Sequence, residues 1–256
     1  MPAFKLSKWY LDCLTDSGDA SIIYAGTVDW GFIHLSYSSL LESTGNQVRE
    51  QRSLREYSQP QFKDSSLSWS SQALDVDAVW HSNSVALRET IFQNEHGSVE
   101  WHCLMPRAHA KVRDRCGLGY VEHLAMSIPP WRIPIQHLRW GRFTSASDYA
   151  VWIDWEGKFS RRIVYLNGDS IRAAVVEDMQ MSLGSGGLLA MDHSVILRDG
   201  PLGTTALSVI PGVAKTYPAR LLQVNECKWR SRARLTRPDG TVAEGWAIHE
   251  RVSWPK

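Results

Sequence analysis

Short segments in which apolar and polar residues alternate recur along this chain, and many of them end at glycine, asparagine or aspartate turns. A period of two is the pattern of a strand with one buried face. Asn167-Gly168, directly after the apolar segment 162–166, is a strong signal for a two-residue hairpin. Further strands are expected at residues 9–12, 20–25, 100–111, 119–127, 149–155, 224–235 and 246–254. This rhythm predicts an all-β fold, in which an antiparallel meander forms a barrel or a sandwich.

Two segments depart from the rhythm. Residues 47–57 (QVREQRSLREY) have helical periodicity, and they are interpreted as a helix or as a polar excursion. The serine-rich residues 65–71 are interpreted as a loop or linker. The sequence therefore predicts very little helix.

Composition excludes several classes of protein. Hydrophobic residues make up 43% and charged residues 21%, which is ordinary for a globular chain. A net charge of +1 provides no clustered basic charge for nucleic acid or an anionic membrane. The chain has no run of about 18 apolar residues that could span a membrane, and its start lacks the pattern of a signal peptide. We therefore expect a cytoplasmic protein whose four cysteines are reduced.

Two distant stretches share a pattern. In each, a tryptophan-bearing strand with an arginine is followed, after a turn, by glycine–aromatic–x–x–histidine. The second elements are Gly119-Tyr-Val-Glu-His123 and Gly245-Trp-Ala-Ile-His249. We therefore predict a duplicated plan, with residues 1–140 in the first half and residues 141–256 in the second.

The first of these stretches resembles a known family. Residues 117–123 (GLGYVEH), 129–131 (PPW) and 138–143 (LRWGRF) are similar to the signature of a lipocalin-like group. That group contains hydroxyneurosporene synthase (the carotenoid hydratase), AttH-like proteins and, more distantly, tocopherol cyclase. Residues 226–230 (ECKWR) and 245–246 (GW) also match, so the resemblance covers residues 100–254, and the first hundred residues in plan only.

The resemblance implies two lipocalin-like antiparallel β-barrel halves packed together, with an apolar or polyketide-like ligand between or within them. Activities in the group include hydration, cyclisation and Diels–Alder-type ring closure. This sequence has His123 after Glu122, where the hydratase pattern has a Tyr-His-Asp run. The resemblance therefore does not extend to carotenoid hydration itself.

Strand geometry sorts the candidate catalytic side chains by face, because alternate residues point to the same side. Tyr120 shares a face with Glu122, Trp140 with Arg142, and Trp152 with Asp154. Turned into a barrel, these side chains would form an aromatic box with carboxyl groups. Desolvation there would raise a carboxyl pKa, as a general acid for an alkene or epoxide requires, and an arginine or tyrosine could polarise a carbonyl. The predicted catalytic residues are Glu122, Asp154, Tyr120 and Arg142.

Large rings commonly line apolar pockets, and the chain has 12 tryptophans. The predicted ligand-binding residues are Trp101, Trp140, Trp152, Trp229, Arg230 and Trp246. A structural interpretation stays open beside this one. Glu122 with Arg142, or Asp154 with Arg230, could form interior ion pairs, and most of the tryptophans could belong to the core. His249 is interpreted as a surface histidine or a hydrogen-bonded one.

No cofactor or metal is expected. The spacing of His102, Cys103, His109 and Cys116 fits no zinc pattern, and Leu183-Gly-Ser-Gly-Gly187 lacks the residues of a phosphate-binding loop. The first function hypothesis is a cofactor-free cyclase, isomerase or hydratase that acts on an isoprenoid or polyketide-like molecule in an aromatic-lined barrel pocket. The second is a non-catalytic lipocalin-like carrier of an apolar ligand, and the third is sugar binding through exposed tryptophans. The oligomeric state is left open.

Overall fold

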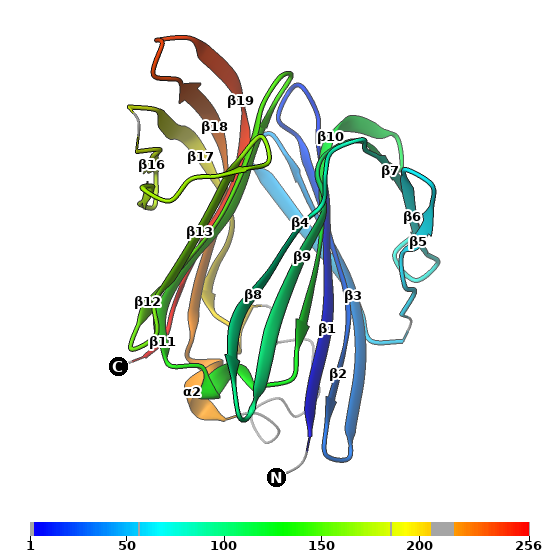
Figure 1. The fold of residues 1–256 in the computed structure, drawn as a ribbon. Helices are drawn as coiled ribbons and strands as arrows, with labels where there is room; N and C mark the ends of the chain where they lie inside the picture. The colour runs from blue at the N-terminus through cyan, green and yellow to red at the C-terminus, as the bar shows by residue number, and fades with distance from the viewer. Residues whose placement is uncertain (1–2, 56, 185, 206–217, 256) are drawn as a thin grey trace. The chain divides into compact units, whose positions relative to one another are not determined.

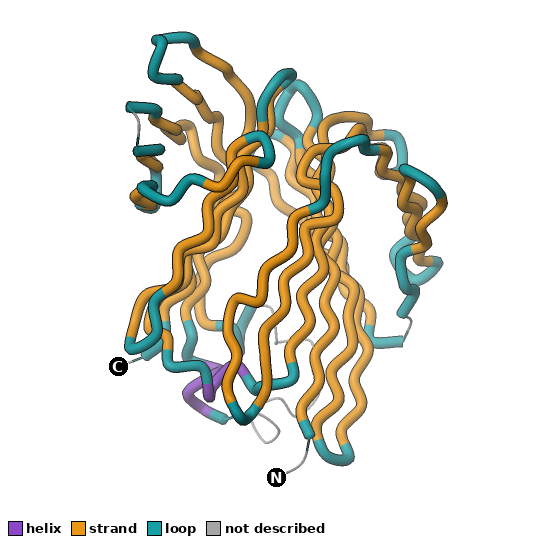
Figure 2. Tube along the Cα trace, viewed as in Figure 1, coloured by secondary structure: helices purple, strands orange, loops and turns teal. Residues whose placement is uncertain are grey.

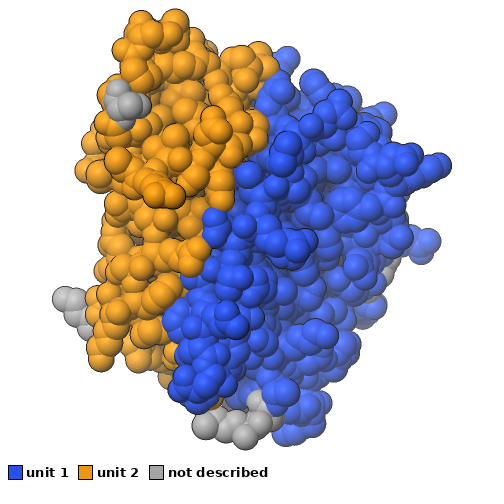
Figure 3. Space-filling model, in the orientation of Figure 1, with its two compact units in different colours: residues 1–129 blue, residues 130–256 orange. Residues whose placement is uncertain are grey.

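The alternation in the sequence is realised as two antiparallel sheets, one in each half of the chain (Figures 1 and 2). The computed structural model describes residues 3–55, 57–184, 186–205 and 218–255. The chain divides into two compact units, Met1–Pro129 and Pro130–Lys256, which are coloured separately in Figure 3. The predicted boundary at residue 140 falls inside a strand that pairs along its length within the second unit, so the division lies before that strand.

The first unit is one sheet of ten strands, in the order β4-β3-β2-β1-β10-β9-β7-β6-β5, with β8 paired to β9. Their bounds are β1 Phe4–Leu14, β2 Ala20–Trp30, β3 Ile33–Thr44, β4 Gln47–Ser53, β5 Gln61–Lys63, β6 Ser66–Ser71, β7 Val76–His81, β8 Leu87–Asn94, β9 Gly97–Val112 and β10 Arg115–Met126. The β1–β10 ladder joins the first strand of the unit to its last, and it places Trp9 opposite His123.

The second unit is one sheet of nine strands, in the order β14-β13-β12-β11-β19-β18-β17-β16-β15. Its elements are η1 Pro130–Arg132, β11 Ile135–Ser145, β12 Tyr149–Gly157, β13 Arg161–Leu166, β14 Asp169–Ser170, β15 Val175–Val176, β16 Gln180–Ser182, β17 Leu188–Pro201, α2 Ala219–Leu222, β18 Asn225–Thr236 and β19 Val242–Ser253. Here the first and last strands pair as well, and Gly141 lies opposite His249.

The two units therefore have the same plan, because in each the meander of the first four strands is joined to the last strand through the first. The glycine of the repeated glycine–aromatic–x–x–histidine pattern has the same role in both. A Cβ on Gly119 would lie 2.5 Å from the carbonyl oxygen of Asp12, and a Cβ on Gly245 would lie 2.1 Å from that of Thr144. Only glycine allows the first strand to approach this closely.

Two local predictions are wrong. Residues 47–53 form β4, which pairs with β3 and is not helical, and residues 66–71 form β6, not a loop. In β6, Leu67 and Trp69 are buried, while Ser68 and Ser70 between them are exposed. The alternation was present in the sequence but was masked by small polar residues. Pairing with neighbouring strands outweighs weak local propensity in such segments.

Each sheet curls around its own apolar core. The core of the first unit includes Leu11, Leu40, Trp80 and Val121, and that of the second includes Phe143, Trp152, Leu189 and Ala247. These clusters fill the concave side of each sheet. Among the described residues, no helix has the length and apolar character needed to cross a membrane.

Candidate active site

Tyr120 and Glu122 lie on the face of β10 that turns away from the apolar core of the first unit. Val121, between them, belongs to that core, and neighbouring residues of a strand point to opposite faces. Both side chains are nevertheless buried, as are those of Tyr10 and Asp12 on β1. The sheet therefore has two buried faces here, an apolar one and one that carries ionisable groups.

Two phenols and two carboxyl groups form a compact cluster on this second face. In the β1–β10 ladder Tyr10 lies opposite Glu122, and Asp12 lies opposite Tyr120. The Tyr10 hydroxyl donates to Asp12 Oδ2 at 2.9 Å, and the Tyr120 hydroxyl donates to Glu122 Oε2 at 2.7 Å. We call Tyr10, Asp12, Tyr120 and Glu122 the phenol–carboxyl cluster. Each strand thus supplies one phenol and the carboxyl group two residues further along.

Aromatic and thiol side chains surround the cluster. Trp101 Nε1, on β9, donates to Glu122 Oε2 at 2.6 Å, so that oxygen accepts two hydrogen bonds. The ring of Tyr10 meets the rings of Tyr24 and Tyr120 edge-on, with centroid separations of 5.3 and 5.9 Å. Burial, with Cys103 and Glu122 nearby, raises the pKa of Tyr120 well above its usual range. Tyr120 therefore keeps its proton and acts as a hydrogen-bond donor.

The structure brings the predicted residues Trp101, Tyr120 and Glu122 together, and it adds Tyr10 and Asp12, which sequence reasoning missed. A signal for the two missed residues exists. Tyr10-Leu-Asp12 and Tyr120-Val-Glu122 have the same spacing of a phenol and an acid. Only the β1–β10 register shows that these two tripeptides are neighbours.

Four other predicted residues share one face of the second sheet: Trp140, Arg142, Arg230 and Trp246. Arg142 and Arg230 both pair with Ile248, from opposite sides. Nη1 of Arg142 donates to Oγ1 of Thr144 at 2.8 Å, and the guanidinium carbon of Arg230 lies 5.7 Å from the ring centroid of Trp246. Cations above aromatic rings attract the ring quadrupole.

The ladders show that equivalent positions of the two units carry different chemistry. With Trp9–His123 matched to Gly141–His249, Tyr10 corresponds to Arg142. By the same matching Cys103 corresponds to Arg230 and Trp101 to Lys228. The first unit thus presents phenols and acids where the second presents basic groups. The plan is repeated, and the polar chemistry has diverged.

Trp152 and Asp154 do not share a face with Trp140 and Arg142. Gly141 lies opposite Trp152, and Arg139 lies opposite Asp154, so both side chains point to the core side of the second sheet. The single aromatic box expected for these four residues is therefore not formed. The register decides this, because a shift of one residue changes every side chain to the other face.

Asp154 is part of an ion-pair network. Nε of Arg162 lies 2.8 Å from Asp154 Oδ1, and Nη1 of Arg139 lies 3.7 Å from Oδ2. Burial raises the pKa of the Asp154 carboxyl, although Arg162 acts in the opposite direction. The structural interpretation of this residue is supported, but its partners are Arg162 and Arg139 and not the predicted Arg230.

Trp229 also lies on the core side of the second sheet, where its ring stacks on that of His249 with a centroid separation of 5.1 Å. His249 is buried, and its Nε2 lies 2.7 Å from the hydroxyl oxygen of Ser231. The interpretation of His249 as a hydrogen-bonded histidine is confirmed. Burial lowers its pKa to about 4.

This shift makes stability depend on pH. The ordinary histidine pKa is about 6.5, so between about pH 6.5 and pH 4 the unfolded chain binds a proton that the folded protein excludes. The free energy of unfolding is therefore expected to fall as the pH falls through this range, by about 3 kcal/mol from His249 alone. Urea unfolding of wild type and His249→Gln near pH 7 and near pH 4 measures this contribution. The variant should lose less stability than wild type, and an unchanged pH dependence would contradict the prediction. His34→Gln is a matched control, because His34 is largely exposed.

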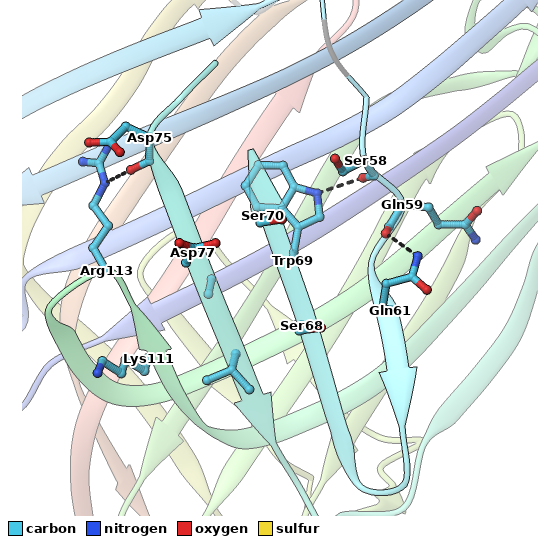
Figure 4. A pocket seen from close by; sticks show the side chains of 12 residues that line it. Ser58, Gln59, Gln61, Ser68, Trp69, Ser70, Asp75, Asp77, Lys111 and Arg113 are labelled. Carbon is cyan, nitrogen blue, oxygen red and sulfur yellow. Dashed lines mark hydrogen bonds between the residues drawn. The ribbon is translucent and has the colours of Figure 1, made fainter. Parts of the chain in front are cut away.

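A separate, polar cavity of about 990 Å³ opens on the first unit beside β6 and β7 (Figure 4). Its described lining residues are Ser58, Gln59, Gln61, Ser68, Trp69, Ser70, Asp75, Asp77, Ala78, Val79, Lys111 and Arg113. Trp69 Nε1 donates to the Ser58 carbonyl at 2.8 Å, which fixes the indole against this segment. None of the predicted site residues lines this cavity, and its lining is too polar for an apolar ligand.

Comparison with known proteins extends this picture. No family model matches the chain, and no curated protein matches its sequence. Among solved structures, CghA crystallised with Sch210972 is similar with a TM-score of 0.55 and 10% identity, over 98% of this chain and 88% of CghA. Kievitone hydratase from Nectria haematococca is similar with a TM-score of 0.54 and 11% identity, over 96% of this chain and 88% of that protein.

An AttH-like protein from Nitrosomonas europaea is similar with a TM-score of 0.52 and 8% identity, over 96% of this chain and 92% of that protein. At such low identity these similarities establish the fold alone. They extend over almost the whole chain, both units included. The chain therefore has the fold of the AttH-containing lipocalin-like group that its sequence resembles.

Proposed function

We propose that this protein is a cofactor-free enzyme of the hydratase or cyclase type, which transfers a proton to an unsaturated apolar small molecule at the phenol–carboxyl cluster. The observation that carries the proposal is the placement of Glu122. Its Oε2 accepts hydrogen bonds from Trp101 and Tyr120, among aromatic rings and away from the packed core. The fold similarity to a protein named as a hydratase, and to CghA crystallised with a small molecule, supports this reaction class.

The chemistry assigned to each residue follows from its hydrogen bonds. Glu122 acts as general acid and base: it gives a proton to a carbon of the double bond and recovers one from water, or from the carbon that closes a ring. Tyr120 keeps its proton and holds Glu122 in place. Tyr10 and Asp12 form a second donor–acceptor pair on the neighbouring strand. The aromatic rings of Tyr24 and Trp101 would pack against the apolar substrate.

A non-catalytic carrier is the second candidate, and the Asp154 network favours it. A carrier is expected to hold its interior carboxylates neutralised by arginine, and Asp154 is paired with Arg162 and Arg139. The apolar cores on the concave sides also leave less of each sheet for a reaction. The two candidates differ in what happens to the ligand after it binds.

The test combines binding and turnover. The purified protein is examined by native mass spectrometry, extracted with organic solvent, and titrated with polyenes, terpenoids and polyketides while tryptophan fluorescence is followed. Each ligand that binds is then incubated with the protein and analysed by chromatography and mass spectrometry. The enzyme predicts a product heavier by one water, or an isomer of equal mass. Ligands recovered unchanged would favour the carrier, and the absence of any binding would overturn both candidates.

A further inference from the structure

Two serines and a histidine form a hydrogen-bonded chain in the second unit. Ser194 Oγ lies 2.6 Å from Ser231 Oγ, and Ser231 Oγ lies 2.7 Å from His249 Nε2. Ser194 is exposed, whereas Ser231 and His249 are 0% and 2% exposed. The chain therefore connects a surface hydroxyl to a buried imidazole. None of its members belongs to the phenol–carboxyl cluster, which lies in the first unit.

Ser194 reaches Ser231 because β17 has a bulge at this point. The register shifts between Asp192 and Val195, so that His193 and Ser194 both stand opposite Ser231 of β18. His193 has a φ of 45°, in the left-handed region that residues other than glycine seldom adopt. Such a conformation costs on the order of 1–3 kcal/mol and is concentrated at functional sites, and bulges often re-aim a side chain beside an active site. Here the bulge turns an exposed serine toward a buried one.

The imidazole sets the direction of the hydrogen bonds. Burial lowers the pKa of His249 to about 4, so the ring is neutral near pH 7 and carries a single N–H. The backbone of Asp178 forms a hydrogen bond with the ring that favours its protonated form, so its carbonyl accepts the ring N–H. Nε2 therefore accepts a proton from the Ser231 hydroxyl, and Ser231 in turn accepts from Ser194. The chain is polarised from the surface to the interior.

The acceptor behind His249 is itself held firmly. Nε of Arg139 donates to Asp178 Oδ1 at 2.9 Å, and Arg251 forms an ion pair with Oδ2 of the same carboxylate. Trp229 stacks on the imidazole and fixes its plane. The charged groups that act on His249 are Asp178, Lys228 and Glu250. A nucleophile, a base in hydrogen-bonding reach and a group that orients the base are the three parts that activate a serine.

We propose that Ser194 is the nucleophile of an acyl-transfer site for small carboxylic esters, with Ser231 as proton relay and His249 as base. Ser194 Oγ forms a bond to the ester carbonyl carbon while its proton passes to Ser231 and the Ser231 proton passes to His249. The bond between the carbonyl carbon and the alkoxy oxygen then breaks, and the proton returns along the chain to the leaving alcohol. Water repeats the sequence on the acyl-serine and releases the carboxylic acid.

The test uses two probes of serine nucleophiles on the full-length protein. A fluorophosphonate should form one covalent adduct, located on Ser194 by peptide mass mapping, and p-nitrophenyl acetate should be hydrolysed. Ser194→Ala should abolish both reactions. Ser231→Ala should slow the labelling of Ser194 by about 10-fold or more, because removing proton transfer to a base typically costs 10²–10⁴-fold and a water can replace part of the relay.

Ser170→Ala and Ser182→Ala are matched controls, because both serines are exposed on strands of the same unit outside the chain. They should react like wild type. Melting temperatures of all variants separate a lost reaction from a lost fold, and the mapping of the adduct in wild-type protein does not depend on any variant. No adduct under excess probe, an adduct on another residue, or equal labelling rates in wild type and a folded Ser231→Ala would each overturn the proposal.

Discussion

Replacing Glu122 by glutamine is expected to lower kcat for the proposed reaction by about 10²–10⁴-fold, the contribution typical of a positioned general acid or base. Trp101 and Tyr120 both donate to one oxygen, Oε2, and the single carbonyl oxygen of glutamine can accept both of these bonds. The side chain keeps its size and its place but can no longer transfer a proton. The measurement is single-turnover conversion of whichever ligand the binding panel identifies.

The control for this variant is Glu100→Gln. Glu100 lies on β9 of the same unit, outside the phenol–carboxyl cluster, and its Oε2 accepts a hydrogen bond from the Thr90 hydroxyl at 2.7 Å. Glu100→Gln should leave turnover unchanged. Tyr120→Phe should reduce turnover less than Glu122→Gln, because it removes one donor and leaves the carboxyl in place. Unchanged conversion in a folded Glu122→Gln would remove the catalytic role from this residue.

Replacing Trp80 by alanine is expected to destabilise the protein by about 3–5 kcal/mol, the usual cost of removing a large buried ring. Trp80 is 0% exposed in the core of the first unit. Its Nε1 donates to the Asp12 carbonyl at 2.7 Å, and its ring occupies the space that a side chain on Gly119 would need. The loss therefore combines a cavity with an unsatisfied carbonyl beside the phenol–carboxyl cluster. Denaturant unfolding at constant pH measures the change.

Two further variants divide this cost. Trp80→Phe keeps most of the apolar bulk but loses the indole N–H, so it should destabilise by about 1–3 kcal/mol, the cost of one buried polar group without its partner. Phe32→Ala removes a fully exposed ring and should change stability by no more than about 0.5 kcal/mol. Equal unfolding midpoints for Trp80→Ala and Phe32→Ala would show that Trp80 does not support the core.

Strand content could be predicted wherever large apolar residues mark the alternation. The residues predicted at 9–12, 149–155 and 224–235 lie within β1, β12 and β18, and the hairpin at Asn167-Gly168 forms as expected, with positive φ at both residues. The failures at β4 and β6 have one cause. In these strands serines and charged residues occupy the exposed positions and much of the pattern, so a period of two is difficult to see before the pairing partner is known.

The candidate site could be predicted only in part, for a geometric reason. A strand's sequence shows which of its residues share a face, and this was sufficient to group Tyr120 with Glu122 and Trp140 with Arg142. It does not show whether that face meets the apolar core. In β10 the core side is taken by Val121, and in β12 it is taken by Trp152, so the two predicted groups of carboxyl and tryptophan lie on different kinds of face.

The sequence by itself determined that the chain is all-β and duplicated in plan, because period-two alternation, turn residues and the repeated glycine–aromatic–x–x–histidine pattern are local properties of the chain. The tertiary structure alone decided which side chains meet. Tyr10 lies 112 positions before Glu122 in the chain and directly opposite it in the sheet, and Ser194 faces Ser231 only because a bulge shifts the register of β17. Register depends on the packing of both faces of a sheet at once, and no single segment of sequence contains that information.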